Sequence, residues 1–363
     1  MRKGSVTVAT APPYEVRVEP TLDLKAAISD TLEPGIAVLL TDTDVGALYA
    51  SSVAEALREV GWVLAETITV PAGEASKSIS VYEGVVRRLA RARVPRGATL
   101  FALGGGVVGD LGGFIASSYA RGIKFVQLPT SLLAMVDSSV GGKVGIDLPE
   151  GKNLIGAFLQ PRLVAANLDW LETLSLREVS HGLAEVIKMG LLADEEFFED
   201  LVRRLEAAQT GDKEALQALI LHSVRFKAAI VAEDEREAGL RAILNYGHTI
   251  GHGLEAATGY DLPHGEAIAA GMLAAARLSH ELLGVDLRSI HEDLLRIAGL
   301  PLKVPAVEVE RVLDAMGSDK KRRASDEAGG YRFVLLEDVG RPIRDVPVGA
   351  TEARQAIGAV LEP

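Results

Sequence analysis

Apolar residues in the first half of the chain alternate between short β-branched runs and stretches in which they recur at helical spacing. The spacing predicts helices over residues 45–60 and 78–93. The short runs between them are typical of buried strands and lie at 36–40, 67–70, 99–103, 125–128 and 163–168. Strands that alternate with helices indicate a mostly parallel sheet with helices on its faces. The first half is therefore predicted to be an α/β domain.

After about Trp170 the strand-like runs give way to longer helical patterns. A polar and basic segment at 317–330 follows them, and 331–336 is then expected to pair as a strand with 343–348. The chain has 363 residues, and single cores stop growing near ~250 to 300 residues. We therefore predict two domains, an α/β domain over 1–172 and a mainly α-helical domain over 173–363. The helical patterns lie at 176–192, 195–208, 213–233, 242–258, 266–283 and 287–298.

Charge and composition narrow the function classes. The chain has 50 acidic against 38 basic residues, a formal net charge of -12, and this field repels nucleic acid and anionic membranes. Cysteine is absent from the sequence, so any metal ion must be bound by His, Asp or Glu. The N-terminus lacks the apolar run of a signal peptide, and no segment has ~18 uninterrupted apolar residues. We expect a cytoplasmic protein with no nucleic-acid or membrane partner.

A glycine motif follows the predicted strand at 99–103. The spacing G-x-G-x-x-G occupies residues 104–109, at the start of a helix predicted over 107–119. Glycines let the backbone approach a pyrophosphate, and a helix N-terminus offers free N–H groups to it. The acidic residue expected ~20 positions later for ribose binding is absent from 123–132, although Asp42, at the end of an earlier strand, could take that role. A tight strand-to-helix turn without a ligand is the alternative.

Three histidines, His248, His252 and His264, fall within one 17-residue window. His248 and His252 are four residues apart, so a helix would present both on one face. Glu185 lies in an apolar helical stretch, where carboxylates are rare unless paired or bound to a metal. Three nitrogen or oxygen ligands with one open position describe a catalytic zinc site. The alternative is that the histidines are hydrogen-bonded and that Glu185 is neutral or paired with Lys188.

Two lysines stand beside glycines in what the pattern predicts to be a long connection between strands. Lys143 follows two glycines, and Lys152 lies between Gly151 and Asn153. Such a segment is suited to bind phosphate or carboxylate, because backbone N–H groups can assist the lysines. The basic tetrad at 320–323 is more typical of a solvated charged face.

Together these motifs resemble the 3-dehydroquinate synthase family over roughly residues 71–321. Departures from the usual family residues occur at Ser131, Ser175 and Tyr246, and none of them removes a metal ligand or a charge. The similarity rests on motifs in a fixed order: G-E-x-x-K at 73–77, G-G-G-V-V-G-D at 104–110, L-G-G-F at 111–114, R-G at 121–122, Q-x-P-T at 127–130, D-S-S-V-G-G-K at 137–143, G-K-N at 151–153, A-E-V-I-K at 184–188, L-N-x-G-H at 244–248, H-G-E at 264–266 and D-K-K at 319–321.

The resemblance implies an NAD-binding α/β domain over 1–172 and a metal- and substrate-binding helical domain over 173–363. It implies a zinc ion, which cobalt could replace, on Glu185, His248 and His264, so that His252 would face the substrate instead. The implied NAD contacts are Asp42, Glu74, Lys77, Gly105, Gly106, Val107, Asp110, Thr130, Ser131, Lys152 and Thr173. The implied catalytic and substrate-binding residues are Arg121, Asp137, Lys143, Asn153, Lys188, Lys227, Arg241, Asn245, His252 and Lys320.

The resemblance also implies a reaction, a phosphate-eliminating lyase step of the shikimate pathway toward chorismate and the aromatic amino acids. Family members convert 3-deoxy-D-arabino-heptulosonate 7-phosphate to 3-dehydroquinate by transient NAD-dependent oxidation, phosphate elimination, re-reduction and intramolecular aldol closure. The expected partner is this phosphorylated sugar acid, and a homodimer is implied.

Three other functions are considered as alternatives to a 3-dehydroquinate synthase. Asn245, His252 and Lys320 argue against another sugar-phosphate cyclase, because these substrate-side positions match 3-dehydroquinate synthases. The lysine set argues against a metal-dependent polyol dehydrogenase, since a neutral polyol has no need of so many cations. Intact metal and lysine positions argue against a non-catalytic nucleotide-binding protein.

Overall fold

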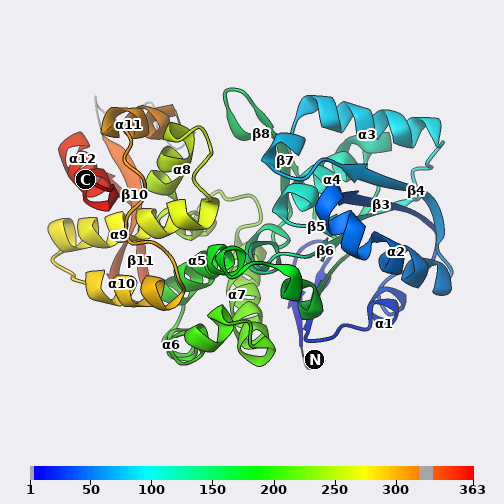
Figure 1. Ribbon diagram of the computed structural model, residues 1–363, viewed down its shortest axis with the longest axis horizontal. Helices are drawn as coiled ribbons and strands as arrows, with labels where there is room; N and C mark the ends of the chain where they lie inside the picture. Colours follow the sequence, from blue (N-terminus) through cyan, green and yellow to red (C-terminus); the bar gives the residue numbers. More distant parts are fainter. Residues whose placement is uncertain (1–3, 319–329) are drawn as a thin grey trace. The chain divides into compact units, whose positions relative to one another are not determined.

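The computed structural model describes residues 4–318 and 330–363, and the chain forms two compact units (Figure 1). The first unit holds the chain up to Leu174 together with Ile220–Arg236. The second holds Ser175–Leu219 and the chain from Glu237 onward. The sequence pattern gave no sign that 220–236 packs with the first unit. Lys320 and most of the polar segment 317–330 lie outside the described residues.

A seven-stranded sheet forms the centre of the first unit, in the order β1-β2-β9-β6-β5-β3-β4. Neighbouring strands are parallel except for β1 and β2, which are antiparallel. This confirms the predicted mostly parallel sheet, although β1 and β2 were not predicted. The strands are β1 (Ser5–Val8), β2 (Tyr14–Glu19), β3 (Ile36–Asp42), β4 (Val63–Val70), β5 (Thr99–Gly104), β6 (Lys124–Pro129) and β9 (Leu163–Asn167).

Alternate residues of β5 pack on opposite faces of this sheet. Leu100 and Ala102 join a cluster with α3 (Ile79–Arg91) and α4 (Gly106–Ser118). Phe101 and Leu103 join the opposite cluster, which contains α1 (Leu24–Ser29) and α2 (Thr43–Glu59). A strand buried on both faces has a continuous apolar run rather than an alternating one. This is why the sequence pattern identified 99–103 so clearly.

The segment predicted to be a long connection is an antiparallel hairpin, β7 (Lys143–Leu148) and β8 (Gly151–Phe158). The prediction was wrong because glycines in a strand look like loop signals. Here they permit close approach, since a Cβ at Gly156 would lie 2.6 Å from the Val144 carbonyl oxygen. Short irregular turns complete the unit: η1 (Glu74–Ser76), η2 (Tyr119–Arg121), η3 (Ala134–Ser138) and η4 (Leu168–Thr173).

Helices dominate the second unit, around a central α9 (His264–Leu283) rich in buried alanine. α9 packs against α5, α8, α12 and strand β10. The predicted pairing of the last two strands is confirmed, whereas α11 and α12 were not predicted. The other elements are α5 (Leu176–Leu192), α6 (Glu195–Gln209), α8 (His248–Ala257), α10 (Arg288–Ile297), α11 (Val309–Ser318), β10 (Tyr331–Asp338), β11 (Arg341–Val348) and α12 (Ala350–Val360).

The helix predicted over 242–258 is divided in two, so that prediction was wrong. A 3₁₀ turn, η5 (Leu240–Asn245), ends before Gly247, and Gly247 has a left-handed φ of 77°. A Cβ at Gly247 would lie 2.7 Å from Met272 Cγ and 3.0 Å from the Met272 nitrogen. Only glycine fits this left-handed turn against α9. The break places His248 at the first residue of α8.

One long helix, α7 (Lys213–Glu233), begins in the second unit and ends in the first. Its length and composition would allow it to cross a membrane, but more than half of its most apolar stretch is buried. The core helix of a soluble protein passes the same test. α7 also carries the buried charge of Lys227, which is unfavourable in lipid.

Candidate active site

The glycine motif forms the turn between β5 and α4, as predicted. Gly105 is the N-cap of α4, and Gly106 and Val107 begin the helix. Glycine has no side chain with which to cap a helix, so the first-turn N–H groups of α4 are suited to an external anion. Thr130, at the end of β6, donates its backbone N–H to the Gly104 carbonyl at 3.0 Å. Ser131 follows, and its Oγ accepts from the Ala134 N–H at 3.3 Å.

Two further predicted nucleotide contacts cap or brace helices of the first unit. Asp42 ends β3, and its Oδ1 accepts from the N–H groups of Asp44 at 3.0 Å and Val45 at 2.8 Å. Thr173 ends η4, and its hydroxyl lies 3.0 Å from the Tyr49 hydroxyl. The carboxyl ends of β3, β5 and β6 meet at one edge of the sheet. Open α/β sheets bind ligands at this edge.

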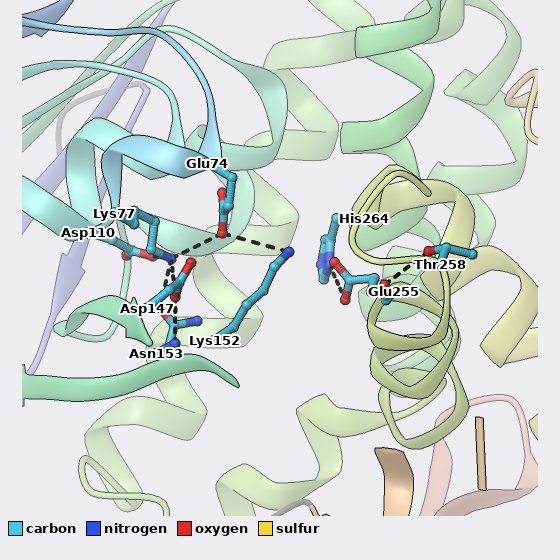
Figure 2. Close-up of polar contacts among 9 residues, drawn as sticks. All are labelled: Glu74, Lys77, Asp110, Asp147, Lys152, Asn153, Glu255, Thr258 and His264. Atoms are coloured by element: carbon cyan, nitrogen blue, oxygen red, sulfur yellow. Dashed lines mark hydrogen bonds and ion pairs between the residues drawn. The ribbon is translucent and has the colours of Figure 1, made fainter. Parts of the chain in front are cut away.

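Lys77 is the centre of a polar cluster in the first unit (Figure 2). Its Nζ donates to Asp110 Oδ2 at 2.9 Å and to Asn153 Oδ1 at 2.7 Å. Glu74 Oε1 and Asp147 Oδ1 lie 3.6 and 3.9 Å from Nζ. Burial alone would lower the pKa of Lys77, but the surrounding carboxylates raise it above its ordinary value. The ammonium is therefore held charged, although its side chain is only 4% exposed.

The hairpin β7–β8 joins this cluster through adjacent residues. Asn153 has a left-handed φ of 53°, and its backbone N–H donates to Asp147 Oδ1 at 2.6 Å. Lys152 Nζ lies 3.7 Å from Glu74 Oε1. Sequence reasoning missed Asp147, because no periodic pattern distinguishes one acidic residue within a hairpin. Two predicted substrate residues, Lys143 at the start of β7 and Arg121 in η2, are exposed.

A second ion pair of the first unit joins residues far apart in the sequence. Lys227 on α7 donates its Nζ to the Asp137 carboxylate at 2.6 Å and to the Asp137 carbonyl at 2.7 Å. Lys227 is 5% exposed. Both residues were predicted to bind substrate, and the structure brings them together. A buried ammonium this close to a carboxylate is stabilised in its charged form.

In the second unit, Glu185, His248 and His264 converge from α5, α8 and α9. The Nε2 atoms of the two histidines each lie 3.4 Å from Glu185 Oε1. One donor atom from each residue falls within 4.8 Å of the others. Lys188 forms an ion pair with Glu185 Oε2. Two imidazole nitrogens and a carboxylate oxygen are the donor set of one class of catalytic zinc site.

The hydrogen bonds around this cluster fit a metal ion. Both carboxylate oxygens of Glu185 are buried, and apart from the ion pair with Lys188 they meet no well-aligned hydrogen-bond donor within the described part of the chain. His248 Nδ1 lies 3.1 Å from the Tyr246 carbonyl oxygen. A carbonyl only accepts, so Nδ1 carries the proton and the Nε2 lone pair faces Glu185. A lone pair facing a carboxylate oxygen is unfavourable unless a cation lies between them.

The charge state of Glu185 agrees with this arrangement. Burial alone would raise the pKa of Glu185, but Lys188 and His264 outweigh it and lower the pKa to about 2. Burial also holds the pKa of His248 well below its ordinary value, with help from the Lys188 charge. The carboxylate of Glu185 and the imidazole of His248 are therefore in the protonation states that metal ligands require. Burial alone would lower the pKa of His264, but Glu185 and Glu255 raise it to about 10, so His264 must lose a proton when a metal binds.

His264 has a second acidic neighbour that sequence reasoning missed. Its Nδ1 lies 3.4 Å from Glu255 Oε2 (Figure 2). The missed signal is an acidic residue seven positions after His248, on the same helical face. His252 lies between His248 and Glu255 on α8 and is exposed, with its ring centroid 5.0 Å from that of His248. That His252 is not one of the three metal ligands stays a prediction, since donor atoms of His252, Glu255 and His264 also lie within 4.8 Å of one another.

The helices that carry Glu185 and His264 are fastened together next to the cluster. A Cβ at Gly265 would lie 2.4 Å from His181 Cα, so α9 approaches α5 at a distance that only glycine permits. Glu266 Oε1 then accepts from Arg177 Nε at 2.8 Å and lies 3.0 Å from His181 Nε2. These contacts fix the spacing between two of the three donor residues.

Two predicted substrate residues lie in η5, in the second unit. Arg241 is 2% exposed. Asn245 Nδ2 donates to Glu237 Oε1 at 2.9 Å and to the Ala242 carbonyl at 3.2 Å. Lys320, the last of the predicted set, lies outside the described residues.

Comparisons with known proteins identify the family. The family model described as 3-dehydroquinate synthase N-terminal matches residues 67–181, and the one described as 3-dehydroquinate synthase C-terminal matches residues 182–322. A 3-dehydroquinate synthase of Acidithiobacillus ferrooxidans is 45% identical over 343 residues, which cover 93% of this chain and 92% of that protein.

Solved structures of sugar-phosphate cyclases share the fold. A 2-deoxy-scyllo-inosose synthase complexed with carbaglucose-6-phosphate, NAD+ and Co2+ has a TM-score of 0.89 at 27% identity, covering 98% of this chain and 100% of that one. The 2-epi-5-epi-valiolone synthase of Streptomyces hygroscopicus subsp. jinggangensis, with NAD+ and Zn2+ bound, has a TM-score of 0.86 at 26% identity and covers 96% of each chain. The identity to the Acidithiobacillus protein is far higher than to either cyclase. The chain therefore belongs to the 3-dehydroquinate synthase family.

Proposed function

We propose that the chain catalyses the 3-dehydroquinate synthase reaction, the conversion of 3-deoxy-D-arabino-heptulosonate 7-phosphate to 3-dehydroquinate and phosphate. The observation that carries this proposal is the 45% identity over 93% of the chain to a 3-dehydroquinate synthase. The donor cluster of Glu185, His248 and His264 supports it, because these are the residues that the family resemblance assigned to a metal.

NAD is the proposed nucleotide, because two solved relatives contain NAD+. The N-terminus of α4, with Gly105, Gly106 and Val107, would bind its pyrophosphate through backbone N–H groups. Asp42 is proposed to accept from the ribose hydroxyls. The remaining proposed contacts are Glu74, Lys77, Asp110, Thr130, Ser131, Lys152 and Thr173.

A divalent metal would be held by Glu185, His248 and His264. Zinc and cobalt are both candidates, since one solved relative contains Zn2+ and another Co2+. Such an ion supplies Lewis-acid chemistry, which polarises a substrate oxygen and lowers the pKa of an alcohol. The protein's part is to keep Glu185 ionised, to keep the Nε2 of His248 unprotonated, and to fix the spacing between α5 and α9.

The substrate is a phosphorylated sugar acid, and cations of this acidic protein are proposed to bind it. Lys143 and Arg121 are exposed cations, and groups of this charge bind phosphate or carboxylate. His252 is also exposed, and its imidazole could take or return a proton near neutral pH. The remaining proposed substrate residues are Asp137, Asn153, Lys188, Lys227, Arg241, Asn245 and Lys320.

The test is incubation of the full chain with the heptulosonate phosphate, NAD+ and zinc, following phosphate release and NADH absorbance together. We expect phosphate release without net NADH, because the cofactor is oxidised again within each cycle. A parallel reaction with a hexose 6-phosphate distinguishes a different cyclase. Stoichiometric NADH would instead support a dehydrogenase, and phosphate release from the hexose alone would support another cyclase.

A homodimer is proposed on the family resemblance alone, and a cytoplasmic location on the sequence pattern. Gel filtration with light scattering of the purified chain measures the oligomer. A mass of 38.4 kDa, that of one chain, would contradict the dimer.

A further inference from the structure

Glu255 is a buried carboxylate on the same face of α8 as His248. Its Oε2 lies 3.4 Å from His264 Nδ1 (Figure 2), and the residue is 2% exposed. The Glu255 backbone carbonyl accepts from Thr258 Oγ1 at 2.9 Å and from the Tyr260 N–H at 2.7 Å. These bonds hold the last turn of α8. The backbone at Glu255 is therefore fixed, and the carboxylate that it carries lies next to the His264 ring.

The two ring nitrogens of His264 face different groups. Both nitrogens face a carboxylate, Glu255 Oε2 beside Nδ1 and Glu185 Oε1 3.4 Å from Nε2, so both can donate in the metal-free chain. A metal on Nε2 requires that nitrogen to lose its proton, and the proton that stays on the ring then lies on Nδ1, beside Glu255. His248 has the same arrangement, with the Tyr246 carbonyl in place of the carboxylate. In both residues a held Nδ1–H leaves Nε2 available to a metal.

We propose that Glu255 is a positioning residue, whose carboxylate holds the His264 ring so that Nε2 faces the metal position defined by Glu185 and His248. A carboxylate behind a metal-bound histidine fixes the ring tautomer and orientation and increases the electron density on the coordinating nitrogen. A charged carboxylate does this more strongly than the neutral carbonyl behind His248. The inference rests on the proposed function and deepens it, because it concerns the same metal site.

The same atoms allow a competing assignment, in which Glu255 is itself a ligand. Donor atoms of His252, Glu255 and His264 also lie within 4.8 Å of one another. A metal there would need the Nδ1 lone pair of His264. It would also leave the Nε2 lone pair of His248 facing Glu185 with no cation between them. Glu185 is fully buried while His252 is exposed, so the cost of that arrangement is high.

Metal affinity of the full chain tests the proposal, measured by competition between the protein and a chelator for zinc. The variant is Glu255→Gln, which keeps the shape and removes the charge, with Glu255→Asp as the conservative variant. Asp200→Asn is the matched control, because it removes another buried carboxylate of the same unit. Urea unfolding of the metal-free proteins is measured in parallel to separate positioning from general stability.

We expect Glu255→Gln to weaken zinc binding ~10 to 100-fold, with one zinc per chain retained and metal-free stability close to that of wild type. The zinc affinity of Glu255→Asp should lie between those of wild type and Glu255→Gln. Asp200→Asn should bind zinc as wild type does. Unchanged affinity in Glu255→Gln would overturn the proposal. A fall in zinc per chain would overturn it in favour of Glu255 as a ligand. Failure of the wild type to bind zinc would overturn the metal site of the proposed function, and this inference with it.

Discussion

Lys77 and Glu185 are buried charges of opposite sign, one in each unit, and the chain stabilises them differently. Lys77 donates hydrogen bonds to Asp110 and Asn153, and Glu74 and Asp147 lie within 3.9 Å. Glu185 pairs with Lys188, but apart from this ion pair its oxygens meet no well-aligned hydrogen-bond donor within the described residues. The chain's own groups therefore satisfy the Lys77 ammonium, while the Glu185 carboxylate still faces two imidazole nitrogens.

The difference indicates which cluster needs an external partner. A buried charge is costly unless opposite charge and hydrogen bonds surround it. The Lys77 cluster meets this condition by itself and acts as a brace between η1, α4 and the hairpin. The Glu185 cluster has one opposite charge in Lys188, but the Nε2 lone pair of His248 faces Glu185 Oε1 favourably only when a further cation lies between them. A cluster that needs a cation can thus be distinguished from one that does not by its unsatisfied atoms rather than by its residue types.

The largest expected effect is on metal binding by Glu185→Gln. The amide removes the charge that faces both imidazoles, so zinc affinity should fall more than the ~10 to 100-fold expected for a residue behind a ligand. Chelator competition measures it, and Glu196→Gln, at an exposed site on α6, is the control. Zinc binding as tight as in wild type would mean that this cluster does not bind the metal.

Removing the Lys77 charge should mainly change stability. Lys77→Met leaves the neighbouring carboxylates without their buried cation, so the free energy of unfolding should fall by ~3 to 5 kcal/mol. Urea denaturation followed by circular dichroism measures it. Lys77→Met with Asp110→Asn should recover part of the loss, because the repulsion among the carboxylates decreases. A decrease in the free energy of unfolding below ~1 kcal/mol would show that water, rather than the Lys77 ammonium, stabilises the charges of the neighbouring carboxylates.

His291 is a third buried ionisable group, and its partners are neutral. Its Nδ1 donates to the Leu287 carbonyl at 2.7 Å, so Nε2 accepts from the Tyr246 hydroxyl at 2.8 Å. Burial lowers the pKa of His291 to about 4. A pKa below the unfolded value stabilises the folded state at neutral pH, and this stability is lost as the pH falls from ~6.5 toward 4.

Acid should therefore destabilise the wild type more than His291→Gln, whose amide can keep both hydrogen bonds without titrating. Between pH 7 and pH 5, the free energy of unfolding should fall by about 2 kcal/mol more in the wild type than in His291→Gln. Urea unfolding at the two pH values measures it, and His280→Gln, at an exposed histidine of α9, is the control. Parallel pH dependence in wild type and His291→Gln would contradict the neutral buried state.

Sequence reasoning predicted the sheet and most helices, because buried strands such as β5 and helices such as α5 have strong apolar patterns. It failed where glycine allows close packing, as in the β7–β8 hairpin and at Gly247. The family resemblance assigned Glu185, His248 and His264 to one metal, and the structure brings them together. Helical spacing alone would have paired His248 with His252. Asp147 and Glu255 were missed, because their importance depends on contacts between elements that local patterns do not encode.

The smallest expected effect comes from an ion pair that resembles the Lys77 contacts in length but not in burial. Arg87 on α3 lies 2.6 Å from Glu83, and their side chains are 65% and 55% exposed. Water screens such a pair, and ordering two long side chains costs entropy, so Arg87→Ala should change the free energy of unfolding by less than ~0.5 kcal/mol. The same urea titration used for Lys77→Met measures it. A loss comparable to that of Lys77→Met would contradict the conclusion that burial, rather than the distance between charges, separates the two cases.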